Sequence, residues 1–337
     1  MELIDRVSHR LKLRDLRLLD AVVRSKSIAR AAVQLNLTQP AVSKALSELE
    51  YMLGVRLVDR SRQGVEPTPY GRALLRSGAA IFDDLRQGVR EIEFLSDPTA
   101  GDVRISASEP IAAGVLPIIV DRLARQYPRM SIYVTQSPIA VLEYRTPQYR
   151  DLRERNVDLV LGPIVRPFAE DDLEAELLFE EKPVVVAGIR SRWVRRRKVE
   201  LADLIDEPWC MPAPDTLVGS RCVEAFRACG LHVPKRTVLA SSIQLYCGLL
   251  ATERFLTMLP DSLLRFSGKR LGIKALPIDL LVPPRLIGIV TLRNRTINPG
   301  ARVFIQTARE VTKPLAKVKH AVTTIEPTEP FSAAKKN

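Results

Sequence analysis

The sequence has 337 residues and a formal net charge of +12, from 51 Lys and Arg against 39 Asp and Glu. Hydrophobic residues make up 46%, so two or three domains with sizeable cores are possible. The positive charge favours an acidic partner, nucleic acid first and a membrane surface second. No stretch reaches the roughly 18 uncharged apolar residues of a membrane-spanning helix, so such a helix is excluded.

The first residues of the sequence and its cysteines further limit the possible classes of protein. Residues 1–20 are charged and lack the apolar segment of a signal peptide, so we expect a cytoplasmic protein. Cys210, Cys222, Cys229 and Cys247 form no C-x-x-C pair and histidines are few, so no zinc site or other metal site is predicted. We interpret the cysteines as reduced buried thiols, with a redox switch through Cys210 or Cys222 as the alternative.

Three amphipathic helices are predicted near the N-terminus, the first over residues 13–23. The next two follow the i, i+3, i+4, i+7 spacing of a helix with one buried face. Their apolar positions are Ile28, Ala31, Ala32 and Leu35, then Val42, Ala45, Leu46 and Leu49. Asn36 and Leu37 leave room for only a tight turn between them, while Thr38 suits an N-cap and Pro40 a first helical turn. The pattern is typical of a helix-turn-helix, with an ordinary two-helix corner as the alternative.

The exposed face of the third helix carries side chains that could read DNA. Gln39 and Ser43 are four residues apart, with Pro40 and Lys44 beside them. Gln can bond adenine, Lys and Ser can reach guanine or phosphate, and Pro can contact a thymine methyl group. We therefore predict base contacts by these four residues. The other DNA-binding candidates of the motif are Ser27, Arg30 and Thr38, the last two at phosphates.

A short hairpin is predicted after Gly54, which is a natural helix stop. One strand is expected over residues 55–58 and its return over 65–67. Arg60 and Arg62 at the tip suit phosphate contacts that position a protein without reading sequence. A hairpin in this place is a wing, so residues 10–68 are predicted to form a winged helix-turn-helix domain, with a solvated basic hairpin as the alternative.

A long helix follows, capped by Thr68 and with Pro69 in its first turn. Apolar or small residues recur at steps of four and three, the seam of a coiled coil. They are Leu74, Gly78, Ile81, Leu85, Gly88, Ile92 and Leu95. Residues 69–97 are therefore predicted to be a dimerisation helix, with packing against its own chain as the alternative. The breaker-rich segment 96–101 ends it and marks a domain boundary.

From residue 102 onward, strand and helix patterns alternate. Strands are predicted at 102–107, 130–136, 157–161, 182–188, 209–211, 237–240, 255–259 and 286–291. Helices are predicted at 114–127, 139–155, 201–205, 219–230, 242–251 and 299–313. Such alternation indicates an α/β fold with open, parallel-type sheets and helices on both faces.

Two breaks, near residues 162–168 and 266–272, divide this α/β region into two lobes. The predicted boundaries are 101–165 with 272–315 for lobe 1, 166–271 for lobe 2, and 316–337 for a mobile tail. Two lobes joined by two crossings enclose a cleft, which is a common site for small ligands. The basic run 190–198 is interpreted as a solvated loop, with a second nucleic-acid patch as the alternative.

Polar residues that follow predicted strands are the candidates for the cleft, because open α/β sheets bind ligands at the carboxyl ends of their strands. They are Ser108, Thr135, Gln136, Ser137, Gly162, Pro163, Asp215, Thr216, Ser241 and Ser242. Exposed N–H groups at the helix starts favour a carboxylate or phosphate on the ligand. The alternative is that the serines and threonines are only helix caps.

The order of these parts resembles the LysR-type transcriptional regulators of bacteria. The most specific stretches are LRDLRLLDAVVRSKSIARAAVQLNLTQPAVSKALSELEYMLGVRLVDR, then GVEPTPYGRALL, then GDVRISAS. The resemblance covers residues 11–314. The family usually carries Phe where this chain has Ile28 and Val58, and its His-Pro turn is replaced here by Ser191, Arg192 and Trp193.

The resemblance implies a regulator that binds double-stranded promoter DNA as a homodimer or homotetramer. It also implies an effector domain like the type II periplasmic binding proteins and contact with RNA polymerase. No Ser-His-Asp order, phosphate-binding glycine loop, paired metal ligands or dinucleotide fingerprint appears in the sequence, so no enzymatic activity or cofactor is expected. The stretch 76–105 looks like a branch of the family that controls catabolism of aromatic acids and sugars. We therefore expect an organic acid or a sugar as the effector, and a protein that acts as an activator. A redox-responsive regulator and a cytosolic solute-binding module are the alternatives.

Overall fold

The computed structural model describes residues 10–61, 64–136, 149–164, 168 and 170–315. The chain divides into two compact units, Met1–Gly88 and Val89–Asn337. Each unit is built around its own cores, and each is described by itself below. Within the described residues, no helix is both long enough and apolar enough to span a bilayer.

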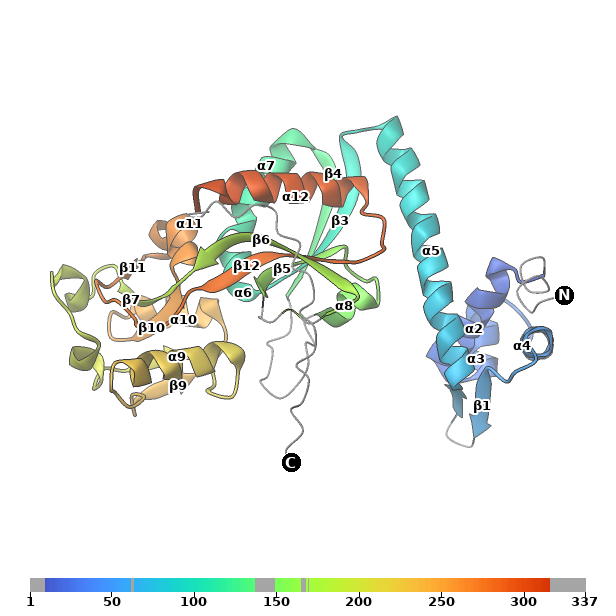
Figure 1. The fold of residues 1–337 in the computed structure, drawn as a ribbon, viewed down its shortest axis with the longest axis horizontal. Coiled ribbons are helices and arrows are strands. Elements are labelled where there is room, and N and C mark those ends of the chain that lie inside the picture. Colours follow the sequence, from blue (N-terminus) through green and yellow to red (C-terminus); the bar gives the residue numbers. More distant parts are fainter. Residues whose placement is uncertain (1–9, 62–63, 137–148, 165–167, 169, 316–337) are drawn as a thin grey trace, which may run out of the picture. The chain divides into compact units, whose positions relative to one another are not determined.

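The first unit is a small helical domain with a two-stranded hairpin (Figure 1). Its elements are α2 (Leu13–Ser25), α3 (Ile28–Gln34), α4 (Gln39–Leu53), β1 (Val58–Ser61), β2 (Gly64–Pro67) and the start of α5 (Pro69–Ser96). Leu19, Val22, Val42 and Leu46 are fully buried in its core. The helical periodicity in the sequence therefore placed the buried face of all three helices correctly.

The hairpin begins later than predicted, because β1 starts at Val58 and not at Val55. The backbone N–H groups of Leu57 and Val58 donate to Glu50 Oε1, at 2.7 and 3.2 Å. The approach to the wing is thus held by a side chain of α4 in place of a strand partner. Gly71 packs so closely against this approach that a Cβ would lie 2.0 Å from the Leu57 carbonyl oxygen.

The first half of α5 packs on its own chain. The Gly71 N–H donates to Thr68 Oγ1 at 3.1 Å, which confirms Thr68 as the cap of this helix. Leu74 packs against the core of the helix-turn-helix, and a Cβ on Gly78 would lie 3.6 Å from Leu16 Cβ. The first part of the predicted seam, which includes Leu74, therefore makes contacts within its own chain.

Lobe 1 of the second unit is a mixed five-stranded sheet in the order β4-β3-β5-β12-β6. Its strands are β3 (Ala100–Ala107), β4 (Arg129–Gln136), β5 (Leu159–Ile164), β6 (Leu173–Glu181) and β12 (Arg285–Leu292). Its helices are α6 (Glu109–Ala113), α7 (Leu116–Gln126), α8 (Arg150–Arg153) and α12 (Pro299–Thr312), followed by the 3-10 turn η4 (Lys313–Leu315). The helices α7 and α12 lie over the sheet (Figure 1). Leu159 and Leu161 share a core with these two helices, whereas Val160 shares a core with α8, so both faces are covered.

Lobe 2 is also a mixed five-stranded sheet, in the order β11-β7-β10-β8-β9. Its strands are β7 (Pro183–Gly188), β8 (Trp209–Met211), β9 (Thr237–Leu239), β10 (Leu256–Pro260) and β11 (Ile273–Ala275). Its helices are α9 (Leu217–Ala228), α10 (Ile243–Ala251) and α11 (Asp261–Leu271), with the 3-10 turns η2 (Arg192–Arg195) and η3 (Leu201–Leu204). Because β8 lies between β9 and β10 and is parallel to both, the helices that follow β8 and β9 start at the same edge.

The sheets depart from the predicted parallel type. In lobe 1 only β3, β4 and β5 are parallel, since β12 runs antiparallel to β5 and to β6. In lobe 2, β7 runs antiparallel to β10 and to β11. The antiparallel strands are those next to the crossings between lobes, where the chain leaves one sheet and returns to it.

Several elements were not predicted, and they shift the lobe boundaries. β6 pairs with β12 in the lobe 1 sheet, and β11 pairs with β7 in lobe 2, so the chain crosses near Lys182 and again between Ala275 and Arg285. The predicted break at 266–272 lies largely within α11, where Gly268 packs near Ile273. The predicted helix 114–127 is α7, and the short helix α6 before it was not predicted, while 201–205 is a 3-10 turn. Most of the predicted helix 139–155, and the predicted tail 316–337, lie outside the described residues.

Candidate functional site

The turn between α3 and α4 is tight because its backbone is closed by local hydrogen bonds. Asn36 adopts a left-handed conformation with φ 54°, and the Leu37 N–H donates to the Ala32 carbonyl at 2.9 Å. This is how helices commonly end without leaving carbonyls unpaired. Thr38 then caps α4, since its Oγ1 accepts from the Ala41 N–H at 3.4 Å. The residues between the helices therefore fix the angle at which α4 is presented.

The outward face of α4 carries the predicted base-reading residues. Gln39, Pro40 and Lys44 are exposed, and Ser43 is half-buried. Lys44 lies 3.9 Å from Glu48, a loose and fully solvated ion pair that leaves the ammonium group available. On the opposite face, Val42 and Leu46 are buried. One face of α4 thus holds the core while the other offers donors, acceptors and an apolar ring.

The remaining DNA-binding candidates flank this face. Thr38 and Arg30 are exposed, and Ser27 caps α3 by accepting from the Arg30 N–H at 3.4 Å. Arg60 is exposed and lies in β1, where it pairs with Val65, so it is on the wing strand and not in the turn. Arg62 lies outside the described residues.

Between the two lobes lies a cavity of about 800 Å³. It is lined on the lobe 1 side by the carboxyl ends of β3 and β5, and on the lobe 2 side by the starts of α9 and α10. The lining mixes apolar side chains with a few converging polar groups, which is the usual composition of a small-molecule site.

Most of the predicted effector residues line this cavity. They are Ser108, Gln136, Gly162, Pro163, Thr216, Ser241 and Ser242. Thr135 does not, because its hydroxyl donates to the Ile105 carbonyl at 3.3 Å within the sheet. Asp215 is exposed and is not part of the lining, and Ser137 lies outside the described residues.

Some of these residues are helix caps, as the alternative interpretation predicts, and others are not. Thr216 and Ser242 do cap helices, accepting from the N–H groups of Gly219 at 3.0 Å and Leu245 at 3.3 Å. Ser108 stands at the N-cap position of α6 but makes no capping bond. Its Oγ is buried and has no hydrogen-bond partner among the described residues, and it faces Gly162, where a Cβ would lie 3.5 Å away. A buried hydroxyl of this kind is uncommon in a folded protein, since most buried polar groups are hydrogen-bonded.

Sequence reasoning missed the charged residues of the cavity, Glu109, Arg221 and Arg285. Arg285 forms a buried ion pair with Glu181, which is itself fully buried at the crossing between the lobes. The guanidinium of Arg221 donates to the Pro283 carbonyl. The sequence offered no signal for these roles, because each contact joins segments far apart in the chain.

All four cysteines are free, and the two candidates for a redox switch, Cys210 and Cys222, are unsuited to that chemistry. Burial raises the pKa of Cys210 and of Cys222 to about 11. At neutral pH both are therefore protonated thiols, whereas oxidation proceeds through the thiolate. This opposes the redox alternative. Among the described residues, no cluster of His, Cys, Asp or Glu could hold a metal ion.

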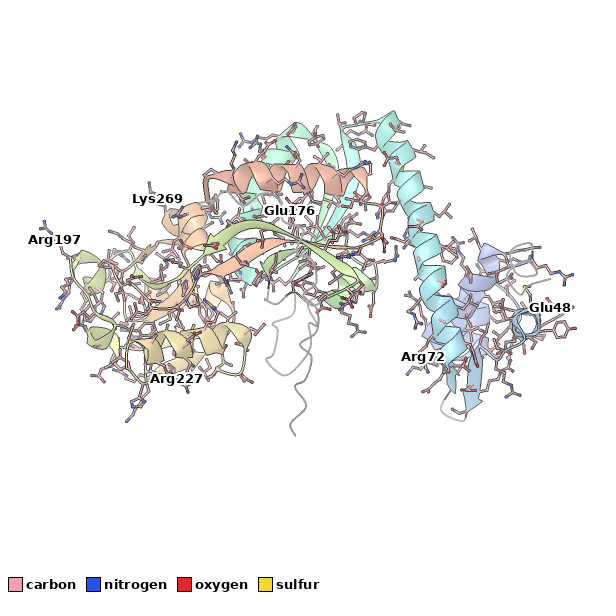
Figure 2. The ribbon with its side chains drawn as sticks, viewed as in Figure 1. Glu48, Arg72, Glu176, Arg197, Arg227 and Lys269 are labelled. Atoms are coloured by element: carbon pink, nitrogen blue, oxygen red, sulfur yellow. The ribbon has the colours of Figure 1, made fainter. Side chains whose placement is uncertain are left out.

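Carboxylates neutralise half of the basic run 190–198. The ion pairs are Arg190–Glu253 at 2.7 Å, Lys198–Glu200 at 3.0 Å and Arg192–Glu207. The guanidinium groups of Arg192 and Arg196 each lie 5.0 Å from the centre of the Trp193 ring. Figure 2 shows Arg197 projecting away from the lobe. These contacts favour the solvated-loop interpretation.

Beyond Gly78, the predicted seam of α5 is exposed. Ile81 is 43% exposed and Leu95 74%, and Leu85, Ile92 and the unpredicted Val89 lie between these values. A stripe of large apolar side chains left open to solvent is the kind of surface at which protein chains commonly meet.

A winged helix-turn-helix joined to a two-lobed domain with an interlobe cavity defines a ligand-responsive DNA-binding protein. A family model described as "LysR substrate binding domain" matches residues 96–313, and "Bacterial regulatory helix-turn-helix protein, lysR family" matches residues 13–72. The chain belongs to the LysR family: it is a DNA-binding transcriptional regulator with an effector-binding domain, and not an enzyme.

Individual relatives agree over nearly the whole length. The regulator GbpR of Azospirillum brasilense is 27% identical over 301 residues, covering 89% of this chain and 86% of its own. TdcA of Escherichia coli (strain K12) is 27% identical over 289 residues, covering 86% of this chain and 89% of its own. A full-length OxyR variant from Pseudomonas aeruginosa has a similar fold, with a TM-score of 0.61 at 21% identity, over 93% of this chain and 100% of that one.

Proposed function

We propose that this regulator binds a promoter operator as a dimer or tetramer and changes transcription when a small organic acid occupies the interlobe cavity. The observation that carries the effector part is the unpartnered Ser108 Oγ, buried at the carboxyl end of β3 beside two helix starts. Helix starts favour anions, so a carboxylate is the group that best fits. Catabolism of an aromatic acid or a sugar, and contact with RNA polymerase, remain expectations from the family resemblance.

Two kinds of contact with DNA are expected, one with bases and one with phosphates. Gln39, Pro40, Ser43 and Lys44 read bases from the exposed face of α4, while Arg30, Thr38 and Arg60 hold phosphates. A single recognition helix reads few bases. The exposed stripe from Ile81 to Leu95 supports pairing of two chains, which would then read a two-part site.

The DNA contacts are tested by comparing two variants on operator and on unrelated DNA. Gln39→Ala should cost about 1–3 kcal/mol and relax preference at one base position. Arg60→Ala should weaken all sequences alike and flatten the dependence of log Kd on log salt by roughly one unit. Gel shifts over a salt series measure both. An equal loss on every sequence for the Gln39 variant, or an unchanged salt slope for the Arg60 variant, removes that residue from its role.

The effector site is tested by calorimetry with small organic acids and sugars. Ser108→Ala should weaken binding of the effector by about 1–3 kcal/mol, because the ligand loses a hydrogen bond from a buried donor. Thr135→Val is the matched control, since Thr135 is one strand away and bonds only within the sheet. Equal affinities for both variants and the unmodified chain would exclude Ser108 from the site.

A further inference from the structure

Glu109 joins the two lobes across the cavity. It is the first residue of α6 in lobe 1, directly after Ser108. Its Oε1 accepts a hydrogen bond of 2.7 Å from the backbone N–H of Ile243, the first residue of α10 in lobe 2, 134 positions along the chain. Glu109, Ile243 and Ser242 all line the cavity. A carboxylate from one lobe is therefore held at a helix start of the other.

Two N–H groups at the start of α10, those of Ile243 and Leu245, consequently already have acceptors. The first turn of a helix presents N–H groups without partners in the helix, and these attract anions. Ser242 takes one of them, the N–H of Leu245 at 3.3 Å, and Glu109 takes that of Ile243. An acidic group of a ligand could reach this position only by removing Glu109, and it would meet a carboxylate of the same charge.

The start of α9 lies at the same edge of the lobe 2 sheet as the start of α10, but among the described residues fewer of its N–H groups have acceptors. Thr216 caps it through the Gly219 N–H at 3.0 Å. Among the contacts between described residues, no side chain accepts from the N–H groups of Leu217 or Val218, and both residues line the cavity. Arg221, one turn further along α9, adds a positive charge to the lining. Of the two helix starts, the cavity thus leaves one open to an anion.

We propose that Glu109 is the specificity-determining residue of the cavity, a tethered anion that closes the start of α10 to acidic groups. The effector then has a single acidic group, held at the start of α9, and a ligand whose second acidic group would need the start of α10 is excluded. The inference rests on the proposed function of the cavity as the effector site. It specifies how many acidic groups the ligand carries and names Glu109 as the residue that determines this number.

Sulfate is the probe that tests this, because it is a small dianion that needs only a vacant anion site. In Glu109→Ala, the N–H of Ile243 is freed and the repelling charge is gone. Sulfate at about ten times its Kd should then raise the Tm by roughly 3 °C more than in the unmodified chain, against NaCl of equal ionic strength. Succinate, with two acidic groups, should behave as sulfate does, whereas butyrate should not distinguish the proteins.

Asp121→Ala is the matched control. Asp121 is an exposed carboxylate on α7 that pairs with Arg125 at 3.0 Å, so its removal changes the net charge equally without touching the cavity. Glu109→Gln is the milder variant. It keeps an acceptor of the same length and should fold like the unmodified chain while gaining part of the sulfate response. Hydrogen exchange should accelerate at the Ile243 amide in Glu109→Ala and not in Asp121→Ala.

Equal sulfate responses in the Glu109 and Asp121 variants would overturn the proposal, as would a sulfate response already complete in the unmodified chain. The measurement needs neither DNA nor an effector. If no organic acid bound the unmodified chain, the proposed function would fail while the sulfate result still decided whether Glu109 closes the α10 start.

Discussion

The two ends of strands β3 and β5 differ in how their polar groups are satisfied. At the carboxyl ends, Ser108 and Gly162 border the cavity, and the Ser108 hydroxyl is buried with no partner in the part of the chain that the structure describes. At the amino ends, Asp102 and Asp158 belong to an ion-pair network with arginines of α5 and of the segment before α12. One pair of strands thus carries an unfilled polar site at one end and a filled one at the other.

The filled end is tightly organised. Arg295 Nη2 lies 3.1 Å from Asp158 Oδ1, and both side chains are at most 5% exposed. The other oxygen of Asp158 accepts from the Arg104 N–H at 2.9 Å. Arg90, in α5, reaches Asp102 at 2.8 Å and Asp158 at 3.7 Å. Each charge therefore has partners, which is the condition under which buried ion pairs do not destabilise a fold.

The two ends of β3 and β5 therefore differ in what their polar groups contact. Paired charges fix the geometry of the strands at one end, whereas at the other end the Ser108 hydroxyl has no hydrogen-bond partner among the described residues. Because Arg90 belongs to α5, the same two strands connect the cavity with the last turns of that helix.

The largest effect is expected at the filled end. Asp158→Ala should lower the free energy of unfolding by about 3–5 kcal/mol, because it removes the carboxylate that the buried Arg295 and the half-buried Arg90 both contact. Urea unfolding measures it. Asp121→Ala, which breaks an exposed pair on the same lobe, should cost about 1 kcal/mol or less. Similar losses in the two variants would show that the network contributes no more than a surface pair.

A smaller effect is expected from a methyl group at the same end. A Cβ on Gly300, in the first turn of α12, would lie 2.5 Å from the backbone carbonyl oxygen of Asp102. Backbone cannot rotate away as a side chain can, so Gly300→Ala should cost about 1–3 kcal/mol through overpacking. A Tm equal to that of the unmodified chain would mean that α12 can move off β3 without loss.

Much of the DNA-binding unit was predictable because its determinants are local. Apolar spacing identified the buried faces of α3 and α4, and Thr38 and Gly54 marked the ends of α4 by chemistry that acts within a few residues. In the cavity, the rule that ligands bind at strand carboxyl ends found Ser108, Gly162 and Thr216 without any knowledge of their partners.

What was missed depends on contacts between distant segments. Glu109 acquires its role from Ile243, and Asp158 from Arg90 and Arg295, and no periodicity links these positions. β6 escaped prediction for a related reason. It is an edge strand whose exposed side carries Glu174 and Glu180, so its sequence LEAELLFEE lacks a continuous apolar run. Edge strands are polar where they face water, which hides them from patterns of burial.

The smallest effect on stability is expected at the unfilled end. A Cβ on Gly162 would lie 3.5 Å from Ser108 Oγ and 3.6 Å from its Cβ, which are ordinary contacts. Gly162→Ala should therefore change the free energy of unfolding by no more than about 0.5 kcal/mol. The added methyl nevertheless occupies space beside the unpartnered hydroxyl, so effector affinity should fall by about 1–3 kcal/mol. Unfolding and calorimetry on one preparation give both values. A stability loss as large as that of Gly300→Ala would show that the cavity end is packed as tightly as the other, and the contrast between the two ends would be lost.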